Sequence, residues 1–241
     1  MNLETDVIAR GFLAPVLIGQ GMYLRRHALA MPEPEGPREG VAGQGPELRV
    51  LIVGDSSAAG VGVDTQDDAF SGQLVRHLGA AYRVHWRLSA KTGATTASTL
   101  ASLHLEQPGA YDIAVTSLGV NDVTHAVPLR RWLRDQAALH ALLGEKFGVS
   151  RSYISALPPV GQFPLLPQPL RWAVGSQVER FKRHLANLSD VAQGFDYVPV
   201  PIEFHPDMLA RDGFHPSAAL YAAWSGIMAD HILKSLAITN P

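Results

Sequence analysis

The sequence predicts an α/β domain, a sheet of five parallel strands with helices packed on both of its faces. Short runs rich in β-branched residues alternate with longer segments whose apolar residues recur at three- and four-residue spacing. This alternation continues from residue 48 almost to the end of the chain, as expected for consecutive βαβ units. The chain has 241 residues, 46% of them hydrophobic and 17% charged, which suits one compact domain with a substantial core.

Five segments are expected to be strands because they are short, apolar and rich in Val, Ile, Tyr and Phe: 48–53, 82–88, 112–118, 150–156 and 195–200. Helices are expected around 68–78, 95–106, 129–146 and 170–193, with a last one from Pro216 to Leu236. Right-handed crossovers between parallel strands bring the loops after the strands to one edge of the sheet, where ligands bind. The chemistry is therefore expected at that edge.

Residues 1–47 are expected to precede the domain, which would span 48–241. Segment 32–47 is rich in Pro and Gly, which predicts a linker without helix or strand. The apolar stretch 11–24 is shorter than the roughly twenty residues that cross a bilayer, and Arg25, Arg26 and His27 follow it. Two interpretations stay open: a helix docked on its own domain, which we favour, or a helix lying in a membrane interface.

Composition argues against several classes of partner and cofactor. The net charge is -2 and the twenty Lys and Arg residues are scattered, so no nucleic acid is expected as a partner. The absence of cysteine removes a thiol nucleophile and thiolate metal sites, and no metal or other cofactor is expected. Glu4 and Asp6 stand where a secretory signal needs positive charge, which predicts a cytoplasmic protein, with peripheral membrane association as the alternative.

Three motifs follow the first three predicted strands. The first strand runs into GDSSAAG, residues 54–60, where small residues allow a sharp turn that holds the Ser56 hydroxyl at a strand-to-helix junction; a merely tight or phosphate-binding turn is the alternative. After the second strand, Gly93 can bring a backbone N–H close to a ligand, or be an ordinary loop glycine. After the third, the Asn121 amide in GVND can donate to a developing oxyanion, or form an Asn-Asp turn.

The last predicted helix is preceded by DGFHPS, residues 212–217, in which Asp212 stands three residues before His215. Across a Gly-containing turn this spacing lets the carboxylate orient the imidazole, whose other nitrogen can then take a proton from Ser56. A surface His beside a helix-capping Asp is the alternative. His205 also precedes a proline, but it lacks an acid three residues earlier, so His215 is the better candidate base.

With these motifs in this order, the chain resembles the GDSL or SGNH hydrolases over residues 48–238. The family has a Ser in a GDS block, a Gly after the second strand, an Asn in a GxND block and a His in a DxxHP block, which correspond here to Ser56, Gly93, Asn121 and His215. The resemblance implies a flavodoxin-like three-layer α/β/α sandwich that hydrolyses esters, thioesters or sugar O-acetyl groups without a metal. One departure is Ser57, where the GDSL tetrapeptide has Leu.

The resemblance also implies a mechanism. Ser56 attacks an acyl carbonyl while His215, oriented by Asp212, removes its proton, and the backbone N–H groups of Ser56 and Gly93 hold the oxyanion together with Asn121. Water then hydrolyses the acyl-enzyme, so the protein is expected to be a serine esterase acting on a small-molecule carboxylic ester. A sugar O-deacetylase, an acyltransferase and a lysophospholipase-like lipase are the alternatives.

Two further classes fit the sequence less well. An α/β-hydrolase would need a G-x-S-x-G pentapeptide, which the sequence lacks. A non-catalytic binding domain on the same fold would be expected to lose at least one member of the set, and all are present.

Segment 157–170 follows the fourth strand and is stiffened by prolines, so it should overhang the same edge of the sheet. Its Phe163, Leu165 and Leu166 are expected to form an apolar wall beside the acyl group, and His125, just past Asn121, is expected to line the pocket. A shallow cleft with such a wall predicts a preference for short acyl chains of roughly two to six carbons.

Overall fold

The computed structural model describes residues 3–191 and 194–239 and contains one six-stranded sheet with the strand order β1-β3-β2-β4-β5-β6. Strands β2 to β6 are parallel, whereas β1 runs antiparallel to β3. The five predicted strands are confirmed, each within two residues of its expected ends. The strands are β1 (Glu39–Ala42), β2 (Glu47–Gly54), β3 (Arg83–Ala90), β4 (Ile113–Ser117), β5 (Arg151–Ser155) and β6 (Phe195–Val198).

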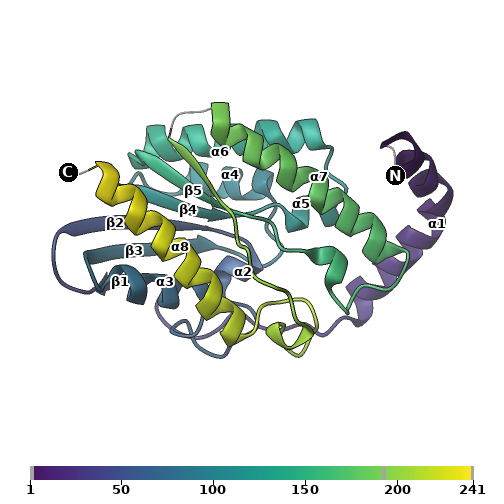
Figure 1. Ribbon diagram of the computed structural model, residues 1–241, viewed down its shortest axis with the longest axis horizontal. Helices are drawn as coiled ribbons and strands as arrows, with labels where there is room; N and C mark the ends of the chain where they lie inside the picture. The colour runs from purple at the N-terminus through teal and green to yellow at the C-terminus, as the bar shows by residue number, and fades with distance from the viewer. Residues whose placement is uncertain (1–2, 192–193, 240–241) are drawn as a thin grey trace.

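Helices cover both faces of the sheet, so the predicted three-layer sandwich is confirmed (Figure 1). Alternate residues of β2 point to opposite layers: Val50 and Ile52 pack with the helices of one face, and Leu51 and Val53 with those of the other. On the first face lie α3 (Phe70–Leu78) and α8 (Ala218–Thr239). On the second lie α4 (Thr96–Leu105) and α6 (Leu129–Phe147), while α7 (Leu170–Val191) packs beside α6.

Short helices occupy the loops that follow the strands. These are α2 (Ser56–Ala59), α5 (Val120–Thr124) and the 3₁₀ turns η1 (Val160–Gln162) and η2 (Pro206–Met208). Because β2 to β6 are parallel, all these loops leave the sheet at its carboxyl edge. The candidate residues of the site therefore come from one edge of the fold.

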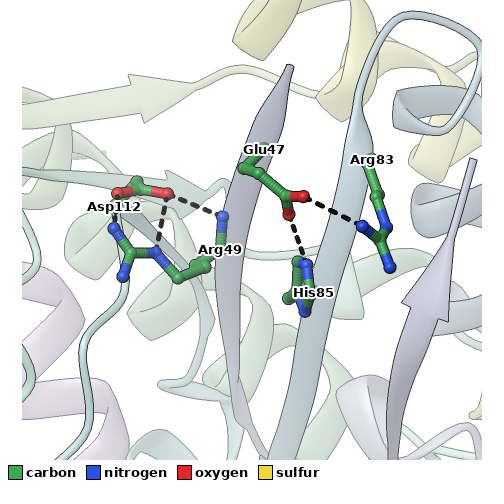
Figure 2. A network of polar contacts seen from close by, with 5 residues as sticks. All are labelled: Glu47, Arg49, Arg83, His85 and Asp112. Carbon is green, nitrogen blue, oxygen red and sulfur yellow. Dashed lines mark hydrogen bonds and ion pairs between the residues drawn. The ribbon is translucent and has the colours of Figure 1, made fainter. Parts of the chain in front are cut away.

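The amino ends of the strands carry a network of charged side chains (Figure 2). Arg49 of β2 donates to both carboxylate oxygens of Asp112, at 3.0 Å from Nη2 and 3.3 Å from Nε. Glu47, also of β2, pairs with Arg83 at 3.2 Å and with His85, both of β3. These cross-strand pairs oppose a shift of register at the edge of the sheet farthest from the loops.

The segment 32–47 contains β1, so the expectation that it would hold no strand was wrong. Strand β1 pairs with the outer side of β3, from Glu39 opposite Arg87 to Ala42 opposite Val84. Gly43 then turns the chain into β2 with φ of +79°, where a Cβ would lie 2.3 Å from the carbonyl oxygen of Tyr82. Four residues with one neighbouring strand suffice for an edge strand, and the glycines form its turn.

Residues 3–27 form one long helix, α1 (Leu3–His27), which stands at the side of the molecule and meets the start of α7 (Figure 1). Gln20 joins it to the chain before α7, donating to the carbonyl of Gln168 at 2.7 Å and accepting from the N–H of Leu170 at 3.1 Å. Within the part of the chain that the structure describes, no helix is long and apolar enough to span a membrane.

His140 of α6 is a buried histidine with neither ring nitrogen hydrogen-bonded to any described residue. Its ring meets the edge of Phe195, with the ring centroids 4.7 Å apart. Burial lowers the pKa of His140 from its ordinary 6.5 to about 4. The folded protein therefore keeps this imidazole neutral at pH values where the unfolded chain protonates it.

We expect His140→Leu to weaken the acid sensitivity of the fold. In the wild type, His140 lowers the free energy of unfolding as pH falls from about 6.5 to about 4, by about 1.4 kcal/mol per pH unit where the effect is steepest. The variant should lose this slope in urea unfolding measured across that range. His184→Leu, an exposed position on α7, is the control and should keep it. Equal slopes in the wild type and His140→Leu would contradict the assignment.

Candidate active site

Ser56 is the first residue of α2, directly after β2. Asp55 caps this helix by accepting the N–H of Ser57 at 3.0 Å. Gly60 ends the helix with φ of +93°, and a Cβ there would approach Ala69 to 2.6 Å. The strand-to-helix turn therefore fixes Ser56 in a mostly buried position, with 7% of the residue exposed.

The structure brings Ser56, His215 and Asp212 together in one line of hydrogen bonds. His215 Nε2 lies 2.9 Å from Ser56 Oγ, and His215 Nδ1 lies 2.5 Å from Asp212 Oδ2. A carboxylate only accepts, so Nδ1 carries the proton in this pair and Nε2 is free to accept the hydroxyl proton. This geometry can remove the proton from Ser56.

Asp212 is itself held by the backbone that follows it. Its Oδ1 accepts the N–H groups of Phe214 and His215, each at 3.0 Å. Burial alone would raise the pKa of Asp212, but the hydrogen bonds from the ring and backbone of His215 and from the backbone of Phe214 outweigh it and lower the pKa. The carboxylate therefore stays charged, which suits a group that orients an imidazole.

Asn121, on α5 after β4, joins the loops of three strands. Its Nδ2 donates to the carbonyl of Ala94 at 3.1 Å and to Asp55 Oδ2 at 3.3 Å. Gly119 begins this turn with φ of +137°, where a Cβ would come within 2.8 Å of Leu157. The amide is thus fixed between the loop after β3 and the cap of α2.

Gly93 lies in the loop after β3 with φ of +78°, and a Cβ on it would meet nothing within 4 Å. Glycine is favoured here by its backbone conformation and not by lack of space. The loop is anchored by Lys91, whose N–H donates to the carbonyl of Gly54 at 3.2 Å. Since Ala94 accepts from Asn121, Gly93 is one residue from the hydrogen bonds that tie the site together.

Asp122 holds the loops together. Its carboxylate is fully buried and accepts the N–H and the hydroxyl of Thr96 at 3.0 and 2.9 Å. Gln136 of α6 donates to the same hydroxyl at 3.1 Å. The start of α4, the turn after β4 and α6 are thereby joined.

Sequence analysis missed Glu33 and Arg38, which lie in the predicted linker. Glu33 Oε1 accepts the N–H and hydroxyl of Thr92, both at 2.8 Å, and Glu33 Oε2 accepts from Arg38 at 2.8 Å. Arg38 also donates to the carbonyl of Ala90. These two residues hold the loop that carries Gly93, and they do so from distant positions that form no local motif.

Two hollows adjoin the candidate site. One, of about 740 Å³, is mainly apolar, and its lining includes Asp55, Ser57, Leu118, Val120, Leu157, Pro158, Pro159, Phe163, Val200, Ile202, Phe204, Pro216, Leu220 and Trp224. The other, of about 530 Å³, lies beside Gly93, and the polar residues of its lining are Arg38, Arg87, Ser89, Lys91, Thr92, Ser98, Thr99, Ser102 and Glu106.

The four residues expected to line a substrate pocket lie in different surroundings. Phe163 lines the apolar hollow and packs against Phe204 and Phe214, with ring centroids 5.3 and 5.5 Å away. Leu166 is buried in the core cluster beneath, and Leu165 is half-buried. His125 is exposed, with Nδ1 2.7 Å from the carbonyl oxygen of Asn121. Among the described residues, only Phe163 of these four belongs to the lining of either hollow.

A hydroxyl, an imidazole and a carboxylate in line at the carboxyl edge of a parallel sheet are the arrangement of a serine hydrolase. The model of the GDSL-like lipase/acylhydrolase family matches residues 52–223, and the chain belongs to this family. It is a carboxylic ester hydrolase of the GDSL or SGNH type, as its motifs indicated.

Solved structures share the fold at low sequence identity, while no curated protein matches the chain. A family 3 carbohydrate esterase from Clostridium thermocellum superposes with a TM-score of 0.60 at 16% identity, covering 79% of this chain and 98% of that one. An inhibitor-bound aryl esterase of M. smegmatis gives 0.56 at 18% identity, covering 78% and 99%. Esterase EstA from Pseudoalteromonas sp., inhibited by monoethylphosphonate, gives 0.56 at 16% identity, covering 78% and 98%.

The buried carboxyl group of Asp55 makes the stability of the fold depend on pH. Burial raises the pKa of Asp55 from its ordinary 3.8 to about 6, although the N–H of Ser57 and the nearby His215 favour the charge. Between these two values the folded protein keeps a proton that the unfolded chain releases. The stabilisation is complete below pH 3.8 and is lost as pH rises through about 6, which is the opposite of the effect of His140.

We expect Asp55→Asn to abolish this loss, so that its unfolding free energy gains about 3 kcal/mol relative to the wild type between pH 3.8 and pH 7. Since the contributions of Asp55 and His140 to the slope have opposite signs, the variant should lose more stability than the wild type as pH falls across this range. Urea unfolding across the range measures both, with exposed Asp64→Asn as the control. A constant difference between Asp55→Asn and the wild type at every pH would show that Asp55 keeps an ordinary pKa in the folded state.

Proposed function

We propose that the protein hydrolyses carboxylic esters through an acyl-enzyme on Ser56. The observation that carries the proposal is the line of hydrogen bonds from Asp212 through His215 to Ser56 Oγ, at 2.5 and 2.9 Å. As Oγ attacks the acyl carbonyl, His215 Nε2 accepts its proton, and Asp212 stabilises the imidazolium that forms. The same proton then passes to the departing alkoxide oxygen. Water, deprotonated by His215 in turn, releases the acid and restores the serine.

The oxyanion of the tetrahedral intermediate would be held by three donors: the N–H groups of Ser56 and Gly93 and the amide of Asn121. The first N–H groups of a helix have no partner within it, which leaves the N–H of Ser56 available. Asn121 Nδ2 holds its longer hydrogen bond, 3.3 Å, to Asp55, and an oxyanion can replace that one while the bond to Ala94 keeps the amide in place. One such donor contributes about 2.7–4 kcal/mol to transition-state stabilisation.

The apolar hollow supports a short acyl group, of roughly two to six carbons. Its lining includes Leu118, Val120 and Phe163, against which a short acyl group can pack. Its lining also includes the ion pair of Glu179 and Lys182, whose charged atoms lie 3.4 Å apart. A longer chain would have to reach beyond the apolar part, where each added methylene gains less than the roughly 0.8 kcal/mol of full burial.

A second candidate is the removal of acetyl groups from sugars, which the hydrogen-bonding groups in the hollow beside Gly93 support. Hydroxyl, guanidinium and carboxylate groups line it, among them Ser89, Arg87 and Glu106, and such groups suit an alcohol that carries several hydroxyls. The fold is shared with a carbohydrate esterase, which supports the same direction. In this alternative the acetyl group lies on the apolar side and the sugar on the polar side of Ser56.

A phosphonate that labels serine hydrolases should modify Ser56 and no other serine, because an imidazole nitrogen lies 2.9 Å from Ser56 Oγ and can activate it. Ser56→Ala and His215→Ala should each reduce kcat by about a thousandfold or more, and Asp212→Asn by less. Peptide mass spectrometry locates the label, and steady-state hydrolysis of p-nitrophenyl acetate measures kcat. Ser57→Ala and His205→Ala are the matched controls and should retain activity. A label on Ser57, or equal losses for both histidine variants, would refute the assignment.

The substrate is tested by kcat/KM across p-nitrophenyl esters from acetate to palmitate, kept below micelle-forming concentrations. We expect a maximum within roughly two to six carbons, because the apolar part of the hollow is limited. A maximum at roughly ten carbons or more would overturn the short-chain proposal. Acetylated xylose oligomers in the same assay, with acetate release as the measurement, distinguish a sugar deacetylase from an esterase that tolerates many alcohols.

A further inference from the structure

Helix α1 exposes an unusually apolar surface. Phe12, Ile18 and Tyr23 are 85%, 61% and 61% exposed, and Val16 and Met22 are about half exposed. At about 100° per residue, Phe12, Val16 and Tyr23 form one stripe along the helix, and Ile18 and Met22 lie on the next side. A helix that is apolar all round is normally covered on every side. We call the set Phe12, Val16, Ile18, Met22 and Tyr23 the outer face.

The protein itself covers only the other side of α1. Leu13, Leu17 and Leu24 are half-buried, and Leu24 packs against the core cluster around α7. Gln20, on the same side, makes the two hydrogen bonds to Gln168 and Leu170. Docking of α1 on its own domain therefore leaves the outer face exposed.

The charges at the end of α1 indicate what covers the outer face. Arg25, Arg26 and His27 form its last turn, and all three are exposed. Among the described residues, neither arginine forms an ion pair with a carboxylate. Next to them, Tyr23 stacks on His27 with ring centroids 4.3 Å apart, which places a ring with a polar tip between the apolar and the basic parts. An apolar face that ends in unpaired basic groups is complementary to lipid tails beneath anionic headgroups.

We propose that the outer face of α1 docks on the surface of a bilayer containing anionic phospholipid, with the helix lying in the interface. The apolar stretch 11–24 is about 21 Å long at 1.5 Å per residue, against about 30 Å of hydrocarbon, so it lies along the surface instead of crossing. Arg25 and Arg26 contact the headgroups while the outer face enters the boundary of the acyl chains.

The helix that we dock on the membrane is connected to the candidate site. Gln20 binds the segment before α7, and Leu165 of the same segment donates its N–H to the carbonyl of Gly213 at 3.4 Å. Gly213 lies between Asp212 and His215. The helix that we place on the lipid surface is thus connected, through one short segment, to the turn that carries the base.

The experiment uses the full purified chain with vesicles of phosphatidylcholine containing about 30% phosphatidylserine, and vesicles of phosphatidylcholine alone. Flotation should recover the protein with the anionic vesicles, and much less with the neutral ones, and added salt should weaken the binding. Phe12→Glu combined with Val16→Glu should reduce binding at least about tenfold, since it places charge in the acyl boundary. Arg25→Gln combined with Arg26→Gln should weaken binding to anionic vesicles about thirtyfold and leave little difference between the two compositions.

Leu105→Glu is the matched control, because Leu105 is an equally exposed apolar side chain, 87% exposed, at the end of α4, and it should bind like the wild type. The outer-face positions are exposed, so each variant should keep the melting temperature of the wild type. Failure of the wild type to float, or undiminished flotation of Phe12→Glu with Val16→Glu, overturns the proposal. A dimer in light scattering that this double variant dissolves, without vesicle binding by the wild type, would show that a second copy covers the outer face.

Discussion

The buried carboxylate of Asp55 is the interaction on which the geometry of the site depends. One oxygen caps the helix that begins with Ser56, and the other accepts from the amide of Asn121. Ser56 and Asn121 follow different strands, and this single side chain connects their two turns. The arrangement costs desolvation, since Asp55 is only 4% exposed, and burial raises its pKa to about 6. The hydrogen bonds that Asp55 accepts from the N–H of Ser57 and from Asn121 offset part of this cost.

Much of this fold follows from local sequence patterns. Val50, Leu51, Ile52 and Val53 form an uninterrupted apolar run, as expected for a central parallel strand buried on both faces. The surroundings of Ser56 and His215 could also be predicted from the sequence. The sharp turn at Ser56 requires small residues, and the acid beside His215 is close to it in the chain. Asp212 and His215 are three residues apart, and their contact is determined by that turn.

Other features depend on contacts between distant residues, which leave no local pattern. Glu33 reaches Thr92 across 59 positions, and its segment resembles a linker in composition. Asp55 and Asn121 are 66 residues apart. The apolar pattern of 157–170 likewise does not show which side chains line a hollow: Phe163 and Leu166 belong to the same buried cluster, and of the two only Phe163 lines the apolar hollow.

The residues of the candidate site lie far apart in the sequence, so the site is completed late in synthesis. Ser56 and His215 are 159 residues apart, and His215 stands just before α8. Tyr221 of that helix donates to the carbonyl of Val61 at 2.7 Å, beside the turn that carries Ser56. A chain still held in the ribosome can form the early strands, but Ser56 has no imidazole beside it until His215 emerges and α8 docks on α3. With the roles that we propose for these residues, the nascent polypeptide is unable to hydrolyse esters until this late step.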